Sequence, residues 1–188
     1  PAKPIELKFG HQNPATSRPH IKFIVPWCKK LEEVTKGRVK VTIYPAQTLC
    51  SERENYPSVV TGVCDITWVV LGMYLGRFPC SEAKTLPFIC LTSGKVDGKI
   101  YSPGKINARM VWELYEQIPE MQAEWSEVKL LDLACAALSH VYTVKKPVHK
   151  QAELKGLKLR ALAGGQTDVL KALGASPVNM PIPEVYEA

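Results

Sequence analysis

Arg160 is the residue whose type and position most directly suggest chemistry. It closes the stretch AELKGLKLR, in which apolar and polar side chains alternate as they do in a half-buried strand. A guanidinium at the end of a strand can face a cleft, where its planar fork donates two parallel hydrogen bonds to one carboxylate. The alternative is a surface arginine paired with a nearby acid such as Glu153, and the residues alone leave both interpretations open.

The cysteines and histidines are the other reactive side chains, and their spacing favours neither a metal site nor a catalytic one. No C-x-x-C pair and no metal-finger spacing occurs, and no nucleophile-elbow, phosphate-loop or zinc-protease motif is present. Cys135 could pair with His140 or His149 as nucleophile and base, but its apolar neighbours disfavour a thiolate. We therefore predict a protein that is not an enzyme and that needs no metal or cofactor.

Disulfides are a separate question, because six cysteines permit fifteen pairings if the protein is exported. Cys80 and Cys90 are the one pair that the sequence nominates, since they bracket a single short loop and strand. Four cysteines have the apolar neighbours typical of small buried thiols: Cys28, Cys64, Cys90 and Cys135.

Length, charge and hydropathy narrow the class of protein. The chain has 188 residues, of which 46% are hydrophobic, enough for a real core in one domain or two small ones. A net charge of +6 favours anionic partners, but the basic residues are scattered and no nucleic-acid-binding module is recognisable. No run of about 18 apolar residues exists that would span a membrane. The first residues fit a cytosolic protein or a mature exported one.

Hydrophobic periodicity predicts strands and helices in alternation. Strands are expected at Ile5–Gly10, Val39–Tyr44 and Asp65–Val70, separated by a helix over Ser17–Lys36 that Pro26 kinks and by a helix from Ser51 to about Gly62. This spacing is typical of right-handed crossovers onto a mostly parallel sheet, so the predicted fold class is α/β.

The remainder of the chain continues this alternation after a predicted loop over residues 71–87. The elements expected there are a helix at Met110–Gln117, strands at Leu130–Ala136, His140–Val144 and Leu157–Leu162, a helix at Gln166–Leu173 capped by Gly174, a strand at Pro177–Met180 and the start of a helix at Pro183–Tyr186.

Several motifs together resemble the solute-binding proteins of tripartite ATP-independent periplasmic (TRAP) transporters. AELKGLKLR followed by GASPVNMP and EVY is similar to that family's D-L-K-G-L-K-[IL]-R … G-A-x-P-x-x-M-P-x-x-E-V-Y. Further family patterns resemble VTKGRVKV with YPAQTLCSER, then GVCDI and LPF, in the same order and spacing. The chain departs from the family at Cys50, where glycine is usual.

The resemblance implies an α/β fold of the two-lobed periplasmic-binding-protein type with mostly parallel sheets. The resemblance covers almost all of this chain, but only about the first two thirds of a family member. We therefore expect a chain that is truncated at the C-terminus and whose second lobe is incomplete. Lobe one is predicted over residues 1–127 and the start of lobe two over residues 128–188, with the crossing at a polar break near Trp125–Glu127.

The same resemblance nominates the ligand-binding residues. Arg160 matches the arginine that anchors the carboxylate of an organic acid, and His140 falls where members that bind sugar acids carry a second arginine. Gln12, with His11 before it, follows the first strand at the family's hinge-side contact. The remaining predicted pocket residues are apolar: Trp68, Val70, Met73, Leu162 and Ile182.

These residues imply a class of ligand and a role. An apolar wall beside one cationic clamp suits a carboxylate with a hydrophobic or aromatic body, and it argues against sugar acids and, less firmly, against small dicarboxylates. We expect a periplasmic subunit that binds this acid between its lobes and delivers it to the membrane permease subunits of a TRAP transporter, with no nucleic-acid partner. The alternatives are a ligand-sensing regulator of the cytosol or periplasm and, more remotely, a cysteine-dependent hydrolase on the same fold.

Overall fold

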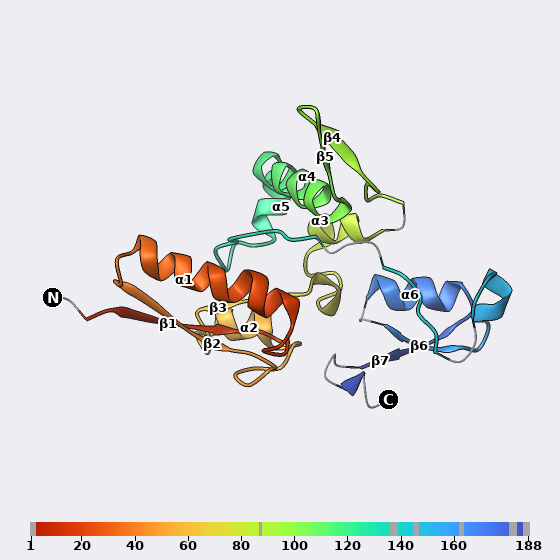
Figure 1. Cartoon of the computed structure of the whole chain (residues 1–188), viewed down its shortest axis with the longest axis horizontal. Helices are drawn as coiled ribbons and strands as arrows, with labels where there is room; N and C mark the ends of the chain where they lie inside the picture. Colours follow the sequence, from red (N-terminus) through yellow and green to blue (C-terminus); the bar gives the residue numbers. More distant parts are fainter. Residues whose placement is uncertain are drawn as a thin grey trace. The chain divides into compact units, whose positions relative to one another are not determined.

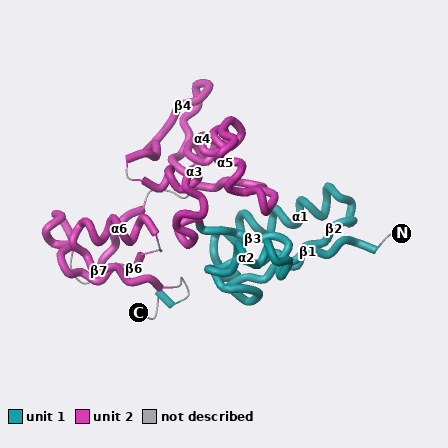
Figure 2. Tube along the Cα trace, turned by 180° about the vertical axis from the view of Figure 1, so that it is seen from behind, with its two compact units in different colours: residues 1–70, 181–188 teal, residues 71–180 magenta. Residues whose placement is uncertain are grey.

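The computed structural model describes residues 3–86, 88–135, 139–144, 147–161, 164–180 and 184–185, and the chain divides into two compact units. Unit 1 comprises Pro1–Val70 with Pro181–Ala188, and unit 2 comprises Leu71–Met180 (Figure 2). The lobe boundary expected after residue 127 is a different division of the chain. The compact units do not test it, so it stays a prediction.

Unit 1 is built on a three-stranded parallel sheet with the order β2-β1-β3 (Figure 1). β1 (Ile5–Gly10) pairs along its whole length with β2 (Val39–Tyr44), and its last two residues pair with β3 (Ile66–Thr67). The predicted bounds of β1 and β2 are confirmed, and so is the α/β class with parallel strands. β3 is shorter than the strand predicted over 65–70, because β1 ends opposite Thr67 and offers no further ladder.

The first helix differs from the single kinked helix predicted over residues 17–36. A π-helical turn, η1 (His20–Ile24), precedes the α-helix α1 (Val25–Val34), whose second residue is Pro26. Proline has no N–H to donate to the carbonyl oxygen four residues back, so the hydrogen-bond register of a helix changes near it. The change of helix type therefore falls where the proline lies.

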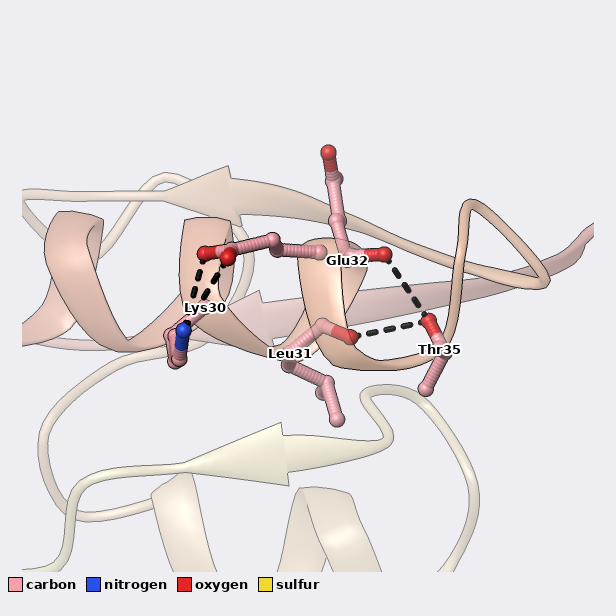
Figure 3. Close-up of polar contacts among 5 residues, drawn as sticks. Lys30, Leu31, Glu32 and Thr35 are labelled. Atoms are coloured by element: carbon pink, nitrogen blue, oxygen red, sulfur yellow. Dashed lines mark hydrogen bonds and ion pairs between the residues drawn. The ribbon is translucent and has the colours of Figure 1, made fainter.

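A threonine side chain, shown in Figure 3, and a glycine N–H close the end of α1. Thr35 Oγ1 donates to the carbonyl oxygens of Leu31 at 2.8 Å and Glu32 at 3.1 Å. The N–H of Gly37, whose φ is +75°, donates to the Glu32 carbonyl oxygen. The glycine supplies the left-handed conformation with which many helices stop, and it directly follows the predicted helix end at Lys36.

The second helix, α2 (Asn55–Val60), begins later than the predicted start at Ser51. Ser51 Oγ donates instead to the Glu54 carboxylate at 2.7 Å, which closes a turn before the helix. A helix starting at Ser51 would hold Pro57 in its interior, where the missing N–H breaks the hydrogen-bond ladder. A start at Asn55 keeps the proline in the first turn, where it is tolerated.

The core of unit 1 lies between α1 and the sheet. Phe9, Ile24 and Cys28 are its buried centre, and partly buried apolar side chains pack around them: Trp27, Val41, Ile43, Ile66 and Trp68. The rings of Phe9 and Trp27 meet edge to face with centroids 6.2 Å apart, an arrangement that aromatic pairs prefer. This packing fixes the carboxyl end of β1.

The described part of unit 2 contains short helices, a hairpin and a parallel strand pair. The first elements are η2 (Leu71–Met73), α3 (Pro79–Glu82), η3 (Ala83–Thr85), β4 (Gly94–Val96), β5 (Lys99–Tyr101), α4 (Pro103–Gln117) and α5 (Pro119–Ala123). The last are η4 (Gln151–Leu154), β6 (Lys158–Ala161), α6 (Gly165–Ala172) and β7 (Ser176–Asn179). The parallel pair β6–β7 with α6 between its strands confirms the elements predicted for this segment. Among the described helices, none combines the length and the apolar composition that a bilayer crossing requires.

Three features of unit 2 differ from the sequence-based expectation. The predicted loop over residues 71–87 contains two 3-10 turns and α3. The hairpin β4–β5 was not predicted, although Asp97 and Gly98, both with positive φ, form the two-residue turn that joins it. The strands predicted at Leu130–Ala136 and His140–Val144 are absent from the described residues 130–135 and 139–144, because neither segment pairs with another strand there.

A stacked aromatic pair organises the core of unit 2. Phe78 is fully buried and stacks on Trp125, with ring centroids 4.2 Å apart and planes at 18°. Trp125 Nε1 donates to Ser81 Oγ at 3.1 Å, and Ser81 Oγ donates to the Glu124 carboxylate at 2.7 Å. The predicted polar break at 125–127 therefore begins with a buried tryptophan that serves the core.

Candidate functional site

The carboxyl end of β1 carries a group of buried polar residues in unit 1. His11, Gln12 and Asn13 follow the strand directly, and only 1%, 4% and 7% of their surfaces are exposed. The carboxyl ends of parallel strands are where α/β proteins place ligands. Gln12 therefore lies at an edge of the sheet that suits its predicted role, although its contact with a ligand stays a prediction.

Asn55 holds this group in place from the first residue of α2. Its side chain is fully buried, and Nδ2 donates to Gln12 Oε1 at 3.1 Å and to the Trp68 carbonyl oxygen at 3.2 Å. Its Oδ1 accepts from the Cys50 thiol at 3.1 Å. Asn55 thus ties the end of β1 to the end of β3. It was not predicted, because the helix was expected to begin at Ser51, which put Asn55 inside it, and no local signal shows its burial.

His11 and His20 form a hydrogen-bonded pair in the same unit. His11 Nδ1 accepts from the N–H of Asn13 at 3.1 Å, so its Nε2 carries the proton and donates to His20 Nδ1 at 3.0 Å. Burial, with a smaller effect from His20, lowers the pKa of His11 to about 4. The imidazole is therefore neutral near pH 7 and held in one tautomer, which gives His11 a structural part whether or not it meets a ligand.

Trp68 and Val70 lie just beyond β3, as partly buried residues. The Trp68 ring meets Phe23 edge to face with centroids 5.7 Å apart, and its carbonyl oxygen accepts from Asn55. Val70 is the last residue of the first segment of unit 1. These contacts do not test the predicted pocket walls, so both assignments stay predictions.

Arg160 lies on β6 in unit 2, and its side chain is exposed. Nε and Nη2 donate to the carbonyl oxygen of Met180 at 3.1 Å and 3.0 Å. These two bonds orient the guanidinium and engage two of the five N–H donors that an arginine carries. Among the described residues, Arg160 does not form the alternative ion pair with Glu153. Glu153 Oε2 instead accepts a hydrogen bond from the N–H of His149 at 2.8 Å.

A close backbone approach joins the turn that carries Met73 to the loop after β6. Gly164 has a φ of +81°, and a Cβ built on it would lie 2.6 Å from the carbonyl oxygen of Gly72. Only glycine combines this φ with so short an approach. Met73, partly buried in η2, is therefore held near the segment that follows Arg160, so unit 2 brings these two predicted site regions together.

His140 is exposed in an irregular segment of unit 2. Its ring meets Tyr142 with centroids 6.3 Å apart, and the neighbouring Ser139 Oγ accepts from Gln166 Nε2 at 2.9 Å. The second bond ties this segment to α6, but it does not test the predicted ligand contact of His140. The last two predicted pocket residues, Leu162 and Ile182, lie outside the described residues.

The six cysteines are free thiols. The disulfide nominated between Cys80 and Cys90 is therefore not formed in this structure. Burial raises the pKa of the Cys135 thiol, which disfavours the thiolate as its apolar neighbours suggested. Within the described ranges, no three or more His, Cys, Asp or Glu side chains gather as a metal ion would require.

Known proteins resemble this chain over most of its length. The DctP family model, for bacterial extracellular solute-binding proteins of family 7, matches residues 9–188. The outer membrane transporter protein TsaT of Comamonas testosteroni is 29% identical over 92% of this chain and 48% of TsaT. The 2,3-diketo-L-gulonate-binding periplasmic protein YiaO of Escherichia coli is 26% identical over 96% of this chain and 52% of YiaO. The chain spans about half the length of these relatives, less than the two thirds expected from its motifs.

Solved TRAP solute-binding proteins share the fold. The one from Rhodoferax ferrireducens T118, in complex with copurified benzoate, has a TM-score of 0.84 and 29% identity, over 98% of this chain and 53% of that chain. A marine metagenome protein specific for aromatic acid ligands, co-crystallised with 3-hydroxybenzoate, has a TM-score of 0.86 and 31% identity. The match covers 100% of this chain and 55% of that chain. The Bordetella bronchiseptica protein with bound mandelate has a TM-score of 0.81 and 30% identity, and the match covers 98% of this chain and 55% of that chain. With a family match over nearly its whole length, this chain belongs to the bacterial extracellular solute-binding proteins of family 7.

Proposed function

We propose that this chain captures an organic acid for a TRAP transporter and that Arg160 binds the carboxylate. The observation that carries the proposal is the state of the guanidinium, which is exposed and oriented by two hydrogen bonds to Met180. Within the described residues the guanidinium makes no other hydrogen bond, which leaves three N–H donors for an incoming anion. An arginine held in this way loses less side-chain entropy on binding than a freely rotating one.

The body of the proposed ligand is hydrophobic or aromatic. The predicted wall residues are apolar, and among those that the structure describes, Trp68, Val70 and Met73 are partly buried. Three relatives with 29%, 31% and 30% identity hold benzoate, 3-hydroxybenzoate and mandelate, which are all aromatic carboxylates. These ligands support the same class for this chain, together with apolar contributions from Leu162 and Ile182.

Gln12 and His140 are proposed as polar contacts that orient the ligand. Asn55 engages the amide oxygen of Gln12, whereas the amide nitrogen makes no hydrogen bond within the described residues and can donate. His140 is exposed and can add a hydrogen bond or a pH-dependent positive charge.

The proposed role is transport rather than catalysis or regulation. The family consists of extracellular solute-binding proteins, which supports a periplasmic location and delivery of the acid to membrane permease subunits. The raised pKa of Cys135 speaks against the hydrolase alternative. Cell fractionation that found the protein only in the cytosol would favour the regulator alternative.

The binding proposal is tested by titrating benzoate and mandelate, with saturation-transfer NMR alongside calorimetry so that weak complexes are also detected. Arg160→Ala leaves the carboxylate without its charge partner, so we expect a loss of about 2–5 kcal/mol, or roughly 30-fold to several thousand-fold in Kd. Arg160→Lys keeps the charge but loses the bidentate geometry, and we expect it to bind more weakly than the parent.

The matched control is Arg109→Ala, which removes an exposed arginine of the same unit. Arg109 pairs with Glu113 on α4 at 2.8 Å, so its loss should leave the affinity for both acids unchanged. Wild-type affinity of Arg160→Ala for every acid that the parent binds would refute the carboxylate clamp.

A further inference from the structure

One hydrogen bond between side chains joins the π-helical turn η1 to the end of β1. His11 directly follows β1, His20 is the first residue of η1, and His11 Nε2 lies 3.0 Å from His20 Nδ1. The two rings are tilted by 45°, with centroids 5.1 Å apart. Within the described residues, the other hydrogen bonds of residues 17–22 stay in the turn before η1 or run along the helix. This histidine pair is therefore the polar contact that ties the start of η1 to the sheet.

The hydrogen bonds of the pair fix where its protons lie. The N–H of Asn13 donates to His11 Nδ1 at 3.1 Å, so His11 carries its proton on Nε2 and donates to His20 Nδ1. His20 then carries its own proton on Nε2. An added proton at His11 Nδ1 would face the N–H of Asn13, and one at His20 Nδ1 would face the N–H of His11. Neither ring can therefore be protonated without breaking one of the two hydrogen bonds.

The two sides of the contact are not held equally firmly. The main chain of His11 is fixed, since its N–H donates to the Tyr44 carbonyl oxygen at 3.1 Å and its carbonyl oxygen accepts from the N–H of Gln47 at 3.1 Å. In η1, the last residue, Ile24, is fully buried in the core, whereas the first residue, His20, is only half-buried. Loss of the histidine contact would therefore free the start of η1 and leave β1 and Ile24 in place.

We propose that the histidine pair is a pH-sensitive contact, which holds the start of η1 against the end of β1 and opens when the pair takes up a proton from solvent. The sequence predicted neither the pair nor this role, because the two histidines are nine residues apart and meet only through the turn between them. The inference concerns how η1 is held. It goes beyond acid binding and does not depend on it.

The surroundings of His11 favour the neutral, closed pair near pH 7. Only 1% of the surface of His11 is exposed, and burial is the main cause that lowers its pKa from 6.5 to about 4, followed by the charge of His20. Arg18 and Lys22, on either side of His20 along the chain, are exposed. Glu52 is a buried acid in the loop after β2, and it does not contribute to the shift. Because the closed form is the neutral one, opening is favoured as the pH falls from 6.5 towards 4.

The test is a pH titration of the nitrogen-15-labelled protein by NMR. At neutral pH, both rings should show a proton on Nε2 and none on Nδ1. At acid pH, the amide protection factors of Ile21 and Val25 should fall by roughly 2- to 10-fold, as the loss of one hydrogen bond implies. These amides donate to the carbonyl oxygens of Ser17 and His20, so they report on the start of η1. The fall should follow the ring signals, with one midpoint between the folded and ordinary pKa values of His11, while the amides of β2 stay protected.

Substitutions of His20 separate the contact from a general effect of acid. His20→Gln supplies an oxygen that accepts from His11 but takes up no proton, so the protection should persist to lower pH than in the parent. His20→Ala removes the acceptor, so the roughly 2- to 10-fold loss should be present already at neutral pH. His149→Gln, which removes an exposed histidine of unit 2, should leave the midpoint unchanged.

The titration of the parent protein requires no variant to fold. Unchanged protection of Ile21 and Val25 while both rings take up protons would overturn the proposal. So would a simultaneous loss of protection in β2, because acid would then unfold unit 1 as a whole.

Discussion

The close approach at Gly164 predicts a large loss of stability for one added methyl group. Gly164 precedes α6 with φ and ψ of 81° and −145°, a conformation that is essentially restricted to glycine. A Cβ there would lie 2.6 Å from the carbonyl oxygen of Gly72 and 3.1 Å from its Cα. Both atoms belong to the backbone, so neither moves aside as the end of a flexible side chain would.

The magnitude follows from two costs in Gly164→Ala. Backbone strain in this region costs about 1–3 kcal/mol, and overpacking against fixed atoms adds about 1–3 kcal/mol. We therefore expect the free energy of unfolding to fall by the sum of the two, about 2–6 kcal/mol. Gly156→Ala is the matched control in the same unit, because Gly156 has a φ of +75° but nothing within 4 Å of a built Cβ. It should cost only the left-handed conformation, about 1–2 kcal/mol.

The assay is urea unfolding of both variants and the parent, followed by circular dichroism, with thermal unfolding as a second measure. For a chain of this size, each kcal/mol corresponds to about 2–4 °C in Tm. The overpacking cost of about 1–3 kcal/mol should therefore make the two variants differ by roughly 2–12 °C. Equal losses in the two variants would refute the reasoning, because the contact with Gly72 would then contribute nothing beyond the φ angle.

Three further predictions concern polar groups that are buried or partly buried. Asn55→Ala should lower the free energy of unfolding by about 2–4 kcal/mol in urea titration, since it leaves Gln12 Oε1 and the Trp68 carbonyl oxygen without their donor; a loss under 1 kcal/mol would contradict this. His11 has a pKa of about 4 in the folded protein, against an ordinary value of 6.5, so the unfolded chain binds more protons between these two pH values. The free energy of unfolding should therefore fall by roughly 3 kcal/mol as the pH drops from 6.5 to 4. His11→Gln should flatten that dependence on pH. Glu124→Gln replaces a carboxylate that accepts the N–H groups of Cys80 and Ser81 in the first turn of α3. The Tm should fall by a few degrees, as a loss of about 1–2 kcal/mol implies. An unchanged Tm would show that these bonds do not stabilise the turn.

Apolar periodicity and stop residues correctly predicted the strands and the helix that the adjacent residues of the chain specify. The alternating strands at Ile5–Gly10 and Val39–Tyr44 agree with the structure at both ends, and α6 ends before Gly174 as predicted. In each case the apolar period and a glycine or proline stop agree, so the neighbours along the chain already specify the element.

The misses share a dependence on partners elsewhere in the chain. Residues 130–135 and 140–144 have strand-like composition, yet a strand exists only where another strand completes its ladder. The opposite error occurred at Asp97–Gly98, where the turn signal was present but the flanking segments were too short to show a period. Periodicity reports the face that a segment buries, and it does not report what pairs with that segment.

The same distinction separates the predicted site residues from those that hold them. Arg160 was predicted because it ends a family motif, and Gln12 because it follows the first strand at the family's hinge-side contact. Their orientation depends on Met180 and Asn55, which act through a backbone carbonyl oxygen and a buried amide. Backbone carbonyl oxygens are present at every residue and leave no trace in a sequence motif. Substitutions at Asn55 should therefore alter ligand affinity through Gln12 while leaving the binding motif unchanged, and a Gln12→Ala, Asn55→Ala double-mutant cycle would measure that coupling.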